Sequence, residues 1–178
     1  PNERREIEQA LFAGKLRANS SSWYGMLVAH LGIAVFIVGV TMVNGYQVER
    51  DVRLEPGQST EVSGWTFTFK GIEPAPGPNY QAFVGTVEVR RGGALVEVLR
   101  PEKRVYAASG QSMTEAAIDT RLTGDLYVSL GEPVTPDGVA GAWGVRIYVK
   151  PFVDWIWGGC LLMALGGFLA IADRRYRI

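Results

Sequence analysis

The strongest constraint in this sequence is a long stretch without any charged side chain. Residues 18–48 contain no Asp, Glu, Lys or Arg, and residues 23–43 within them are almost entirely apolar. Roughly 20 apolar residues in a helix cross the hydrocarbon core of a bilayer. The stretch is too long for the core of a cleaved signal peptide, and no small-residue cleavage pattern follows it. It therefore predicts a transmembrane helix over residues 22–45.

A second apolar stretch covers residues 155–172, between Asp154 and the basic C-terminal end. It predicts a transmembrane helix over residues 151–172, and Trp and Tyr side chains lie at the expected membrane interfaces of both stretches. The alternative is a pair of buried helices in a soluble protein. Uncharged runs of this length are rare in soluble cores, so the sequence favours a membrane protein with two spans.

Basic residues close to the two stretches predict their orientation. Arg and Lys precede the first stretch and follow the second, which places both ends of the chain in the cytoplasm. Residues 1–21 then form a cytoplasmic amphipathic segment, with Ile7 and Leu11 on one side, and residues 173–178 form a cytoplasmic tail. Residues 46–150 lie outside the cytoplasm.

Between the two stretches the apolar period changes from helical to two. Residues 65–69 alternate aromatic and polar side chains, which predicts a half-buried strand. The segment Arg91-Gly92-Gly93 is typical of a tight hairpin turn. Residues 114–119 are an exception and fit either one helical turn or an irregular segment. The predicted strands are 48–54, 65–69, 83–90, 94–99, 127–130 and 143–149. Short strands at this spacing predict an antiparallel β-barrel or sandwich.

Charge and the few reactive side chains exclude several function classes. The chain has 18 basic and 18 acidic residues, without the basic excess of a nucleic-acid binder. One Cys and one His exclude a disulfide framework and a multi-ligand zinc site within this chain. Cys160 is interpreted as a small packing residue. Four carboxylates could supply an acid–base pair, but solvated loop positions are the simpler interpretation: Glu115, Asp119, Asp125 and Glu132.

His30 is the most informative residue, because it lies inside the first apolar stretch. An ionisable side chain there indicates function by default, and imidazole needs a hydrogen-bond partner or a metal. Small residues that permit close helix packing share one side of this stretch: Gly25, Ala29, Gly32 and Gly39. His30 lies about 100° round the helix from Ala29, on the flank of that packing surface. It suits an axial ligand of haem iron, and the alternative is a hydrogen bond to a neighbouring helix.

Both apolar stretches carry more small residues than a lone helix pair needs. The second contains Gly159, Gly166, Gly167 and Ala170. We therefore expect the chain to be one piece of a larger assembly, and its start at Pro1 agrees with a chain cut from a longer one.

Eight segments along the chain match, in order, those of one known family. They are residues 26–32, 48–54, 77–80, 112–119, 125–132, 141–152, 155–157 and 173–177. On these segments the sequence resembles the C-terminal part of CcmF, the membrane cytochrome c haem lyase of the bacterial and mitochondrial Ccm maturation system.

The resemblance implies an activity, a cofactor and a site residue. Members of the family attach haem to apocytochrome c through thioethers with the thiols of a Cys-x-x-Cys-His motif, and a membrane-tethered haem chaperone delivers the haem. By this resemblance His30 is a ligand of haem (heme b), one of two outer-side histidines that hold its iron. Because His30 lies about 8 residues from the cytoplasmic end of its span, this role needs a haem cavity in the membrane that opens outward.

The resemblance also implies partners and a location. The partners are the Trp-rich membrane part of the haem lyase, the haem chaperone, apocytochrome c and the thiol-reducing Ccm components. The location is the bacterial inner membrane, with residues 46–150 in the periplasm. The Trp-rich segment and the family's other histidines are absent here, so the chain is a fragment or a naturally split subunit. The alternative function is a non-catalytic membrane hairpin that presents a β domain for assembly or partner docking.

Overall fold

The computed structural model describes residues 20–121, 123–134 and 140–173. Most of the predicted amphipathic segment 1–21 and of the predicted tail 173–178 lies outside the described residues. The chain divides into two compact units. One contains the helices up to Thr41 and from Asp154, and the other is Met42–Val153.

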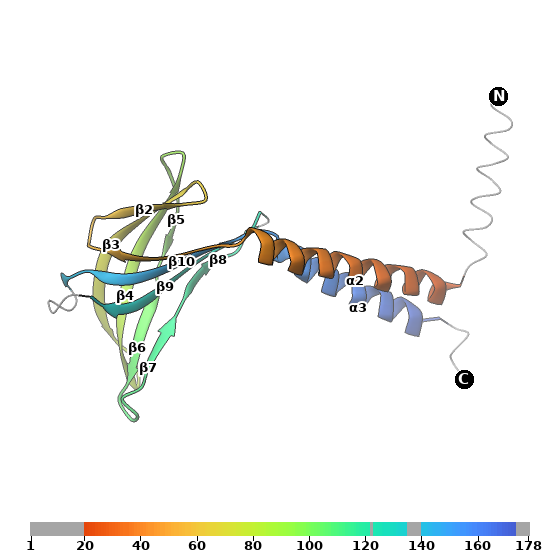
Figure 1. The fold of residues 1–178 in the computed structure, drawn as a ribbon. Coiled ribbons are helices and arrows are strands. Elements are labelled where there is room, and N and C mark those ends of the chain that lie inside the picture. Colours follow the sequence, from red (N-terminus) through yellow and green to blue (C-terminus); the bar gives the residue numbers. More distant parts are fainter. Residues whose placement is uncertain (1–19, 122, 135–139, 174–178) are drawn as a thin grey trace. The chain divides into compact units, whose positions relative to one another are not determined.

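Two apolar helices dominate the first unit (Figure 1). Helix α2 is Ser21–Tyr46 and helix α3 is Val153–Ile171. Both are long and apolar enough to cross a membrane, as the sequence predicts. The backbone N–H of Ser22 donates a 2.9 Å hydrogen bond to Oδ2 of Asp173, so the start of α2 lies beside the end of α3. The two helices therefore pack as an antiparallel pair.

Glycines form the contact between the two helices. Gly25, Gly32 and Gly39 of α2 are buried and recur every seven residues, so they share one face. On α3 the buried glycines are Gly159 and Gly166. A Cβ atom on Gly32 would lie 2.8 Å from the carbonyl oxygen of Gly159, too close for any side chain. The predicted small-residue face of α2 is confirmed as a helix-packing surface, and α3 occupies it.

The second unit is a β-sandwich. Its strands are β1 Val48–Leu54, β2 Ser59–Val62, β3 Trp65–Pro76, β4 Tyr80–Arg91, β5 Ala94–Leu99, β6 Glu102–Tyr106, β7 Ser112–Glu115, β8 Ala117–Asp119, β9 Asp125–Pro133 and β10 Trp143–Lys150. One antiparallel sheet, here sheet A, has the order β1-β10-β9-β8. The other, sheet B, has the order β2-β3-β4-β6-β7, and β5 pairs with the second half of β4 (Figure 1). The predicted fold class, two apolar helices flanking an antiparallel β domain, is confirmed as a sandwich.

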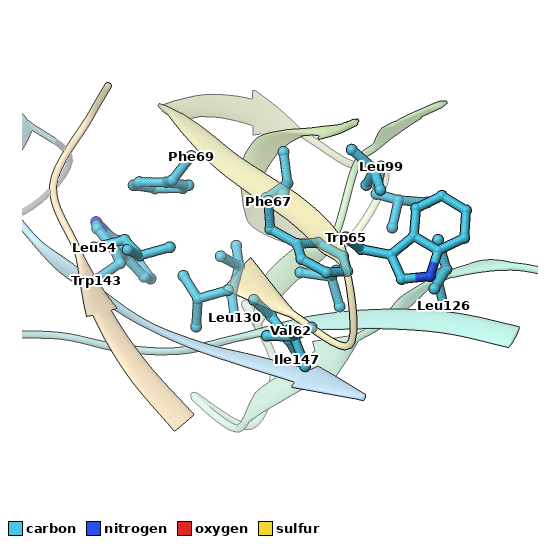
Figure 2. Packing of buried hydrophobic residues seen from close by; sticks show 14 of the residues in the cluster. Leu54, Val62, Trp65, Phe67, Phe69, Leu99, Leu126, Leu130, Trp143 and Ile147 are labelled. Carbon is cyan, nitrogen blue, oxygen red and sulfur yellow. The ribbon is translucent and has the colours of Figure 1, made fainter. Parts of the chain in front are cut away.

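The core lies between the two sheets. Trp65, Phe67 and Phe69 alternate with polar residues along β3 and are buried against sheet A, as Figure 2 shows. Leu130 and Ile147 of sheet A belong to the same cluster. Burying one face of each sheet removes large apolar side chains from water, at ~25 cal/mol per Å². The alternation predicted for residues 65–69 is confirmed, and the strand runs on to Pro76.

The predicted hairpin at Gly92 and Gly93 is also confirmed. These residues have φ angles of 56° and 83° and join β4 to β5, with Arg91 opposite Ala94. Positive φ at both turn positions matches the twist of the strands, and glycine adopts it without strain.

The interpretation of residues 114–119 as a helical turn or an irregular segment is wrong. They lie in β7, which pairs with β6, and in β8, which pairs with β9. Residues 59–62 and 102–106 also form strands that the periodicity did not predict. These strands are short and rich in polar residues, so pairing with a neighbouring strand defines them, whereas their own apolar pattern does not.

Candidate functional site

His30 lies in the first half of α2 with an exposed ring. Its Nδ1 lies 2.8 Å from the carbonyl oxygen of Met26, one turn earlier. A carbonyl oxygen only accepts hydrogen bonds, so Nδ1 carries the proton in this contact, and in the neutral ring Nε2 then keeps its lone pair. A histidine held in this tautomer by a backbone carbonyl is arranged as metal-ligating histidines usually are.

His30 does not flank the contact between α2 and α3. It lies roughly 160° round the helix from Gly32, on the opposite side of α2 from the buried glycines. The expectation of a flank position is therefore wrong for this contact. The expected angle of about 100° separates His30 from Ala29, whereas the contact is centred on Gly25, Gly32 and Gly39.

The face of α2 that carries His30 is mixed apolar and polar. Ile37 is 57% exposed and lies two turns from His30, and Thr41 and Asn44 follow on the same side. The hydroxyl of Thr41 donates to the carbonyl oxygen of Ile37 at 2.8 Å. Sequence reasoning singled out His30 alone on this face. Thr41 and Asn44 follow His30 by 11 and 14 residues, and residues at these spacings lie on the same side of an α-helix. This spacing could have identified both polar residues from the sequence.

The residues present on this face fit one side of a haem. A neutral imidazole with an available Nε2 is a common axial ligand of haem iron, and apolar neighbours such as Ile33 and Ile37 suit the porphyrin. Within residues 20–121, 123–134 and 140–173, no group of three or more His, Cys, Asp or Glu side chains could hold a metal ion.

The four candidate carboxylates lie in strands, and the interpretation as loop residues is wrong. Glu115 lies 3.4 Å from Arg104 and Asp119 pairs with Arg121. Glu132 pairs with Lys103, whose buried side chain reaches it from the opposite sheet. Asp125 lies opposite Lys150 in the register of β9 and β10. Three of these carboxylates therefore form ion pairs with basic residues of the sandwich.

Cys160 lies in α3, and its thiol is half-buried.

Comparison with known proteins identifies the family to which the chain belongs. Residues 45–151 match the family model described as the CcmF C-terminal beta-sandwich. The chain belongs to the CcmF family. The cytochrome c-type biogenesis protein CcmF of Pseudomonas aeruginosa is 49% identical over 162 residues, which are 91% of this chain and 24% of that protein. The protein of the same name from Escherichia coli strain K12 is 48% identical over 170 residues, 96% of this chain and 26% of that protein.

A solved structure shares this fold. The structure titled Cytochrome c Heme Lyase CcmF aligns with a TM-score of 0.68 and 21% identity, over 84% of this chain and 24% of that one. This chain thus spans about a quarter of the length of the CcmF proteins that it matches. The expected membership of the CcmF family is confirmed.

Proposed function

We propose that this chain is the C-terminal unit of a cytochrome c haem lyase. In that role it helps to hold haem delivered by a haem chaperone while the haem is attached to the Cys-x-x-Cys-His motif of apocytochrome c. Membership of the CcmF family supports the proposal, since the relatives are named cytochrome c-type biogenesis proteins. The observation that carries it is the Nε2 of His30, which is left available by the bond from Nδ1 to Met26.

His30 would hold the haem iron in this proposal. Bound haem would supply the iron that Nε2 coordinates and the two vinyl groups to which the cysteine thiols add. The bond to Met26 holds the ring in the ligating tautomer, and Ile33 and Ile37 beside it offer apolar surface to the porphyrin. His30 stands roughly 14 Å by helical rise from Ser21 and roughly 24 Å from Tyr46. This depth favours a haem within the span over a haem at the outer end of α2, where the resemblance would place it.

The proposed placement follows the sequence. Residues 22–45 and 151–172 span the bacterial inner membrane, residues 46–150 lie in the periplasm, and residues 1–21 and 173–178 lie in the cytoplasm. The proposed partners are the Trp-rich part of the lyase, the haem chaperone, apocytochrome c and the thiol-reducing Ccm components. A periplasmic sandwich is on the side of the membrane where those partners would meet it.

Replacing His30 tests the ligand role. We expect His30→Ala, in the reconstituted lyase complex, to change the haem absorption spectrum and to lower haem transfer at least tenfold, because one axial ligand is lost. Added imidazole should restore the spectrum. Met26→Leu is the matched control, since it keeps the backbone carbonyl that His30 uses. An unchanged spectrum together with undiminished transfer in His30→Ala would remove the ligand role.

A second candidate is a non-catalytic membrane hairpin that presents the β domain for assembly or partner docking. One observation favours it: His30 already has a hydrogen-bond partner in its own helix, so the neutral ring is partly satisfied without haem. This candidate predicts that His30→Ala leaves bound haem unaltered, whereas removal of the β domain loses protein partners. The same pair of variants therefore separates the two functions.

A further inference from the structure

A groove lies on the outer face of sheet A, the face turned away from the core. It has a volume of about 620 Å³ and is lined by residues of β1, β7, β9 and β10. Volumes of this size are typical of sites that hold a ligand. All of its residues belong to the unit Met42–Val153.

Two glycines form part of the floor of this groove. Gly131 of β9 and Gly144 of β10 lie side by side, and a Cβ atom on Gly131 would come 3.2 Å from the carbonyl oxygen of Gly144. The register of β9 and β10 is irregular between Trp143 and Val145, at this position. Without side chains here, the backbone of a bound molecule can approach the sheet closely.

Ser129 points to a polar ligand. It lines the groove and is only 6% exposed, and within the described residues its hydroxyl has no hydrogen-bond partner. By contrast, the nearby hydroxyl of Thr114 donates to the carbonyl oxygen of Leu130 at 3.3 Å. The hydroxyl of Ser129 can both donate and accept, and it lines the groove without a partner among the described residues, so it is suited to bond a group that enters the groove.

The same groove offers an aromatic surface. The rings of Tyr127 and Tyr148 meet edge to face, with centroids 5.3 Å apart, and Lys150 lies with Nζ 4.7 Å from the centroid of Tyr148. The hydroxyl of Tyr148 donates to Glu49 at 2.7 Å. The two rings are held in place and present a surface on which an apolar side chain can pack.

Each charged residue that lines the groove has an ionic partner, and Arg53 pairs with Glu55 at 3.3 Å. Arg146 donates two hydrogen bonds to Asp51, at 2.6 and 2.8 Å, and its Nε also lies 3.5 Å from Glu49. A guanidinium held by two carboxylates attracts a phosphate or another anion weakly. The groove therefore suits a neutral ligand with amide groups and apolar side chains, which is the chemistry of a polypeptide.

We propose that this groove binds an extended, unfolded polypeptide segment. The backbone of the segment lies over Gly131 and Gly144, one of its polar groups bonds Ser129, and an apolar side chain packs on the two tyrosines. The proposed function identifies the segment as apocytochrome c around its haem-attachment motif, and that identification rests on the proposed function. Residues of the sandwich thus position the polypeptide, separately from the ligand role of His30.

Peptide binding to the whole chain in detergent tests the proposal. The probe is a fluorescein-labelled peptide of about a dozen residues with a reduced Cys-x-x-Cys-His motif, and the readout is fluorescence anisotropy.

Ser129→Ala should weaken binding about 3- to 10-fold, because one hydrogen bond is lost. In Gly144→Leu the new Cβ is tolerated, with its nearest neighbour at 3.6 Å, and the rest of the side chain fills the groove. That variant should weaken binding more than about tenfold. Thr66→Leu, on the outer face of sheet B, is the control and should bind normally.

The outcomes separate this proposal from the proposed function. Peptide binding should persist in His30→Ala, and haem spectra should be normal in the Ser129 and Gly144 variants. A benzophenone group on the peptide should cross-link to β9 or β10. Absence of binding, equal binding by all variants, or cross-links confined to sheet B would overturn the groove as a peptide site. Equal affinity for a scrambled peptide without the motif would overturn the assignment to apocytochrome c.

Discussion

At the scale of single residues, charged side chains of the sandwich pair both between neighbouring strands and along one strand. The hydrogen bond from Arg146 holds the pKa of Asp51 below its usual 3.8, and Asp51 in turn raises the pKa of Arg146. On sheet B, the hydrogen bond from Arg90 lowers the pKa of Glu88, and the hydrogen bond to Glu102 raises that of Arg104. All of these groups keep some contact with solvent, so each pair stabilises the fold only slightly. Only the pair of Asp51 and Arg146 joins two strands and can favour their register.

Acid unfolding tests the pair of Asp51 and Arg146. The pKa of Asp51 is lower in the folded than in the unfolded chain, so its contribution to stability is present above about pH 4 and is lost as the pH falls through the folded pKa. Asp51→Asn should therefore lose less stability than the parent between pH 6 and pH 3. Urea unfolding followed by tryptophan fluorescence measures the difference. Glu61→Gln on β2, which has no ion pair within the described residues, is the control. The same fall in both variants would contradict the prediction.

At the scale of elements, the two helices differ in the faces that they turn away from each other. The outward face of α3 is apolar, with Trp157 65%, Leu161 71% and Phe168 70% exposed. The outward face of α2 carries His30 and Thr41 among its apolar residues. Polar side chains in a membrane usually face protein, whereas apolar ones tolerate lipid. The difference agrees with a function located on α2.

Neighbouring glycines of α3 allow a matched test of the helix contact. A Cβ atom on Gly166 would lie 2.4 Å from the backbone nitrogen of Ala29, whereas nothing lies within 4 Å of one on Gly167. Gly166→Leu should push the helices apart and cost about 1–3 kcal/mol or more, because backbone atoms cannot move aside independently. Gly167→Leu should be tolerated. The midpoint of unfolding in mixed detergent and SDS measures both variants. Equal midpoints would show that the glycine contact does not hold the pair together.

At the scale of the whole molecule, the sandwich has its own core, and its first and last strands pair with each other. Its first strand β1 pairs along its whole length with its last strand β10, from Val48 opposite Val149 to Leu54 opposite Trp143. The segments that lead to the helices therefore leave the sandwich side by side. Domains with adjacent ends and a separate core usually fold alone.

Excision of the sandwich tests this autonomy. Residues 47–151 expressed alone should give a β-type circular dichroism spectrum and a single cooperative urea transition, because the core residues all lie within that range. The fluorescence of Trp65 and Trp143, which are buried in that core, follows the transition. The full chain in detergent is the reference for the midpoint. A broad, non-cooperative transition of the excised segment would show that the sandwich needs the helices to fold.

Much of this fold is readable from the sequence where a local signal suffices. The spans of α2 and α3 follow from uncharged length, which needs no partner to interpret. Strand β3 begins with strict alternation at Trp65, and Gly92-Gly93 specifies the turn between β4 and β5 through its backbone freedom. Strands β7 and β8 have no such signal, because they are short, polar and defined by their pairing with β6 and β9.

The features of the candidate site also fall into those that the sequence determines and those that the tertiary structure determines. The sequence by itself determined that His30 lies within an apolar helix, since hydropathy is a property of the neighbouring residues along the chain. Only the tertiary structure decided that His30 faces away from α3, because that depends on which glycines meet across the helix pair. It alone also assembled the groove, since Ser129, Gly131 and Gly144 come together through the register of two strands. Contacts between distant segments depend on geometry that local composition does not encode.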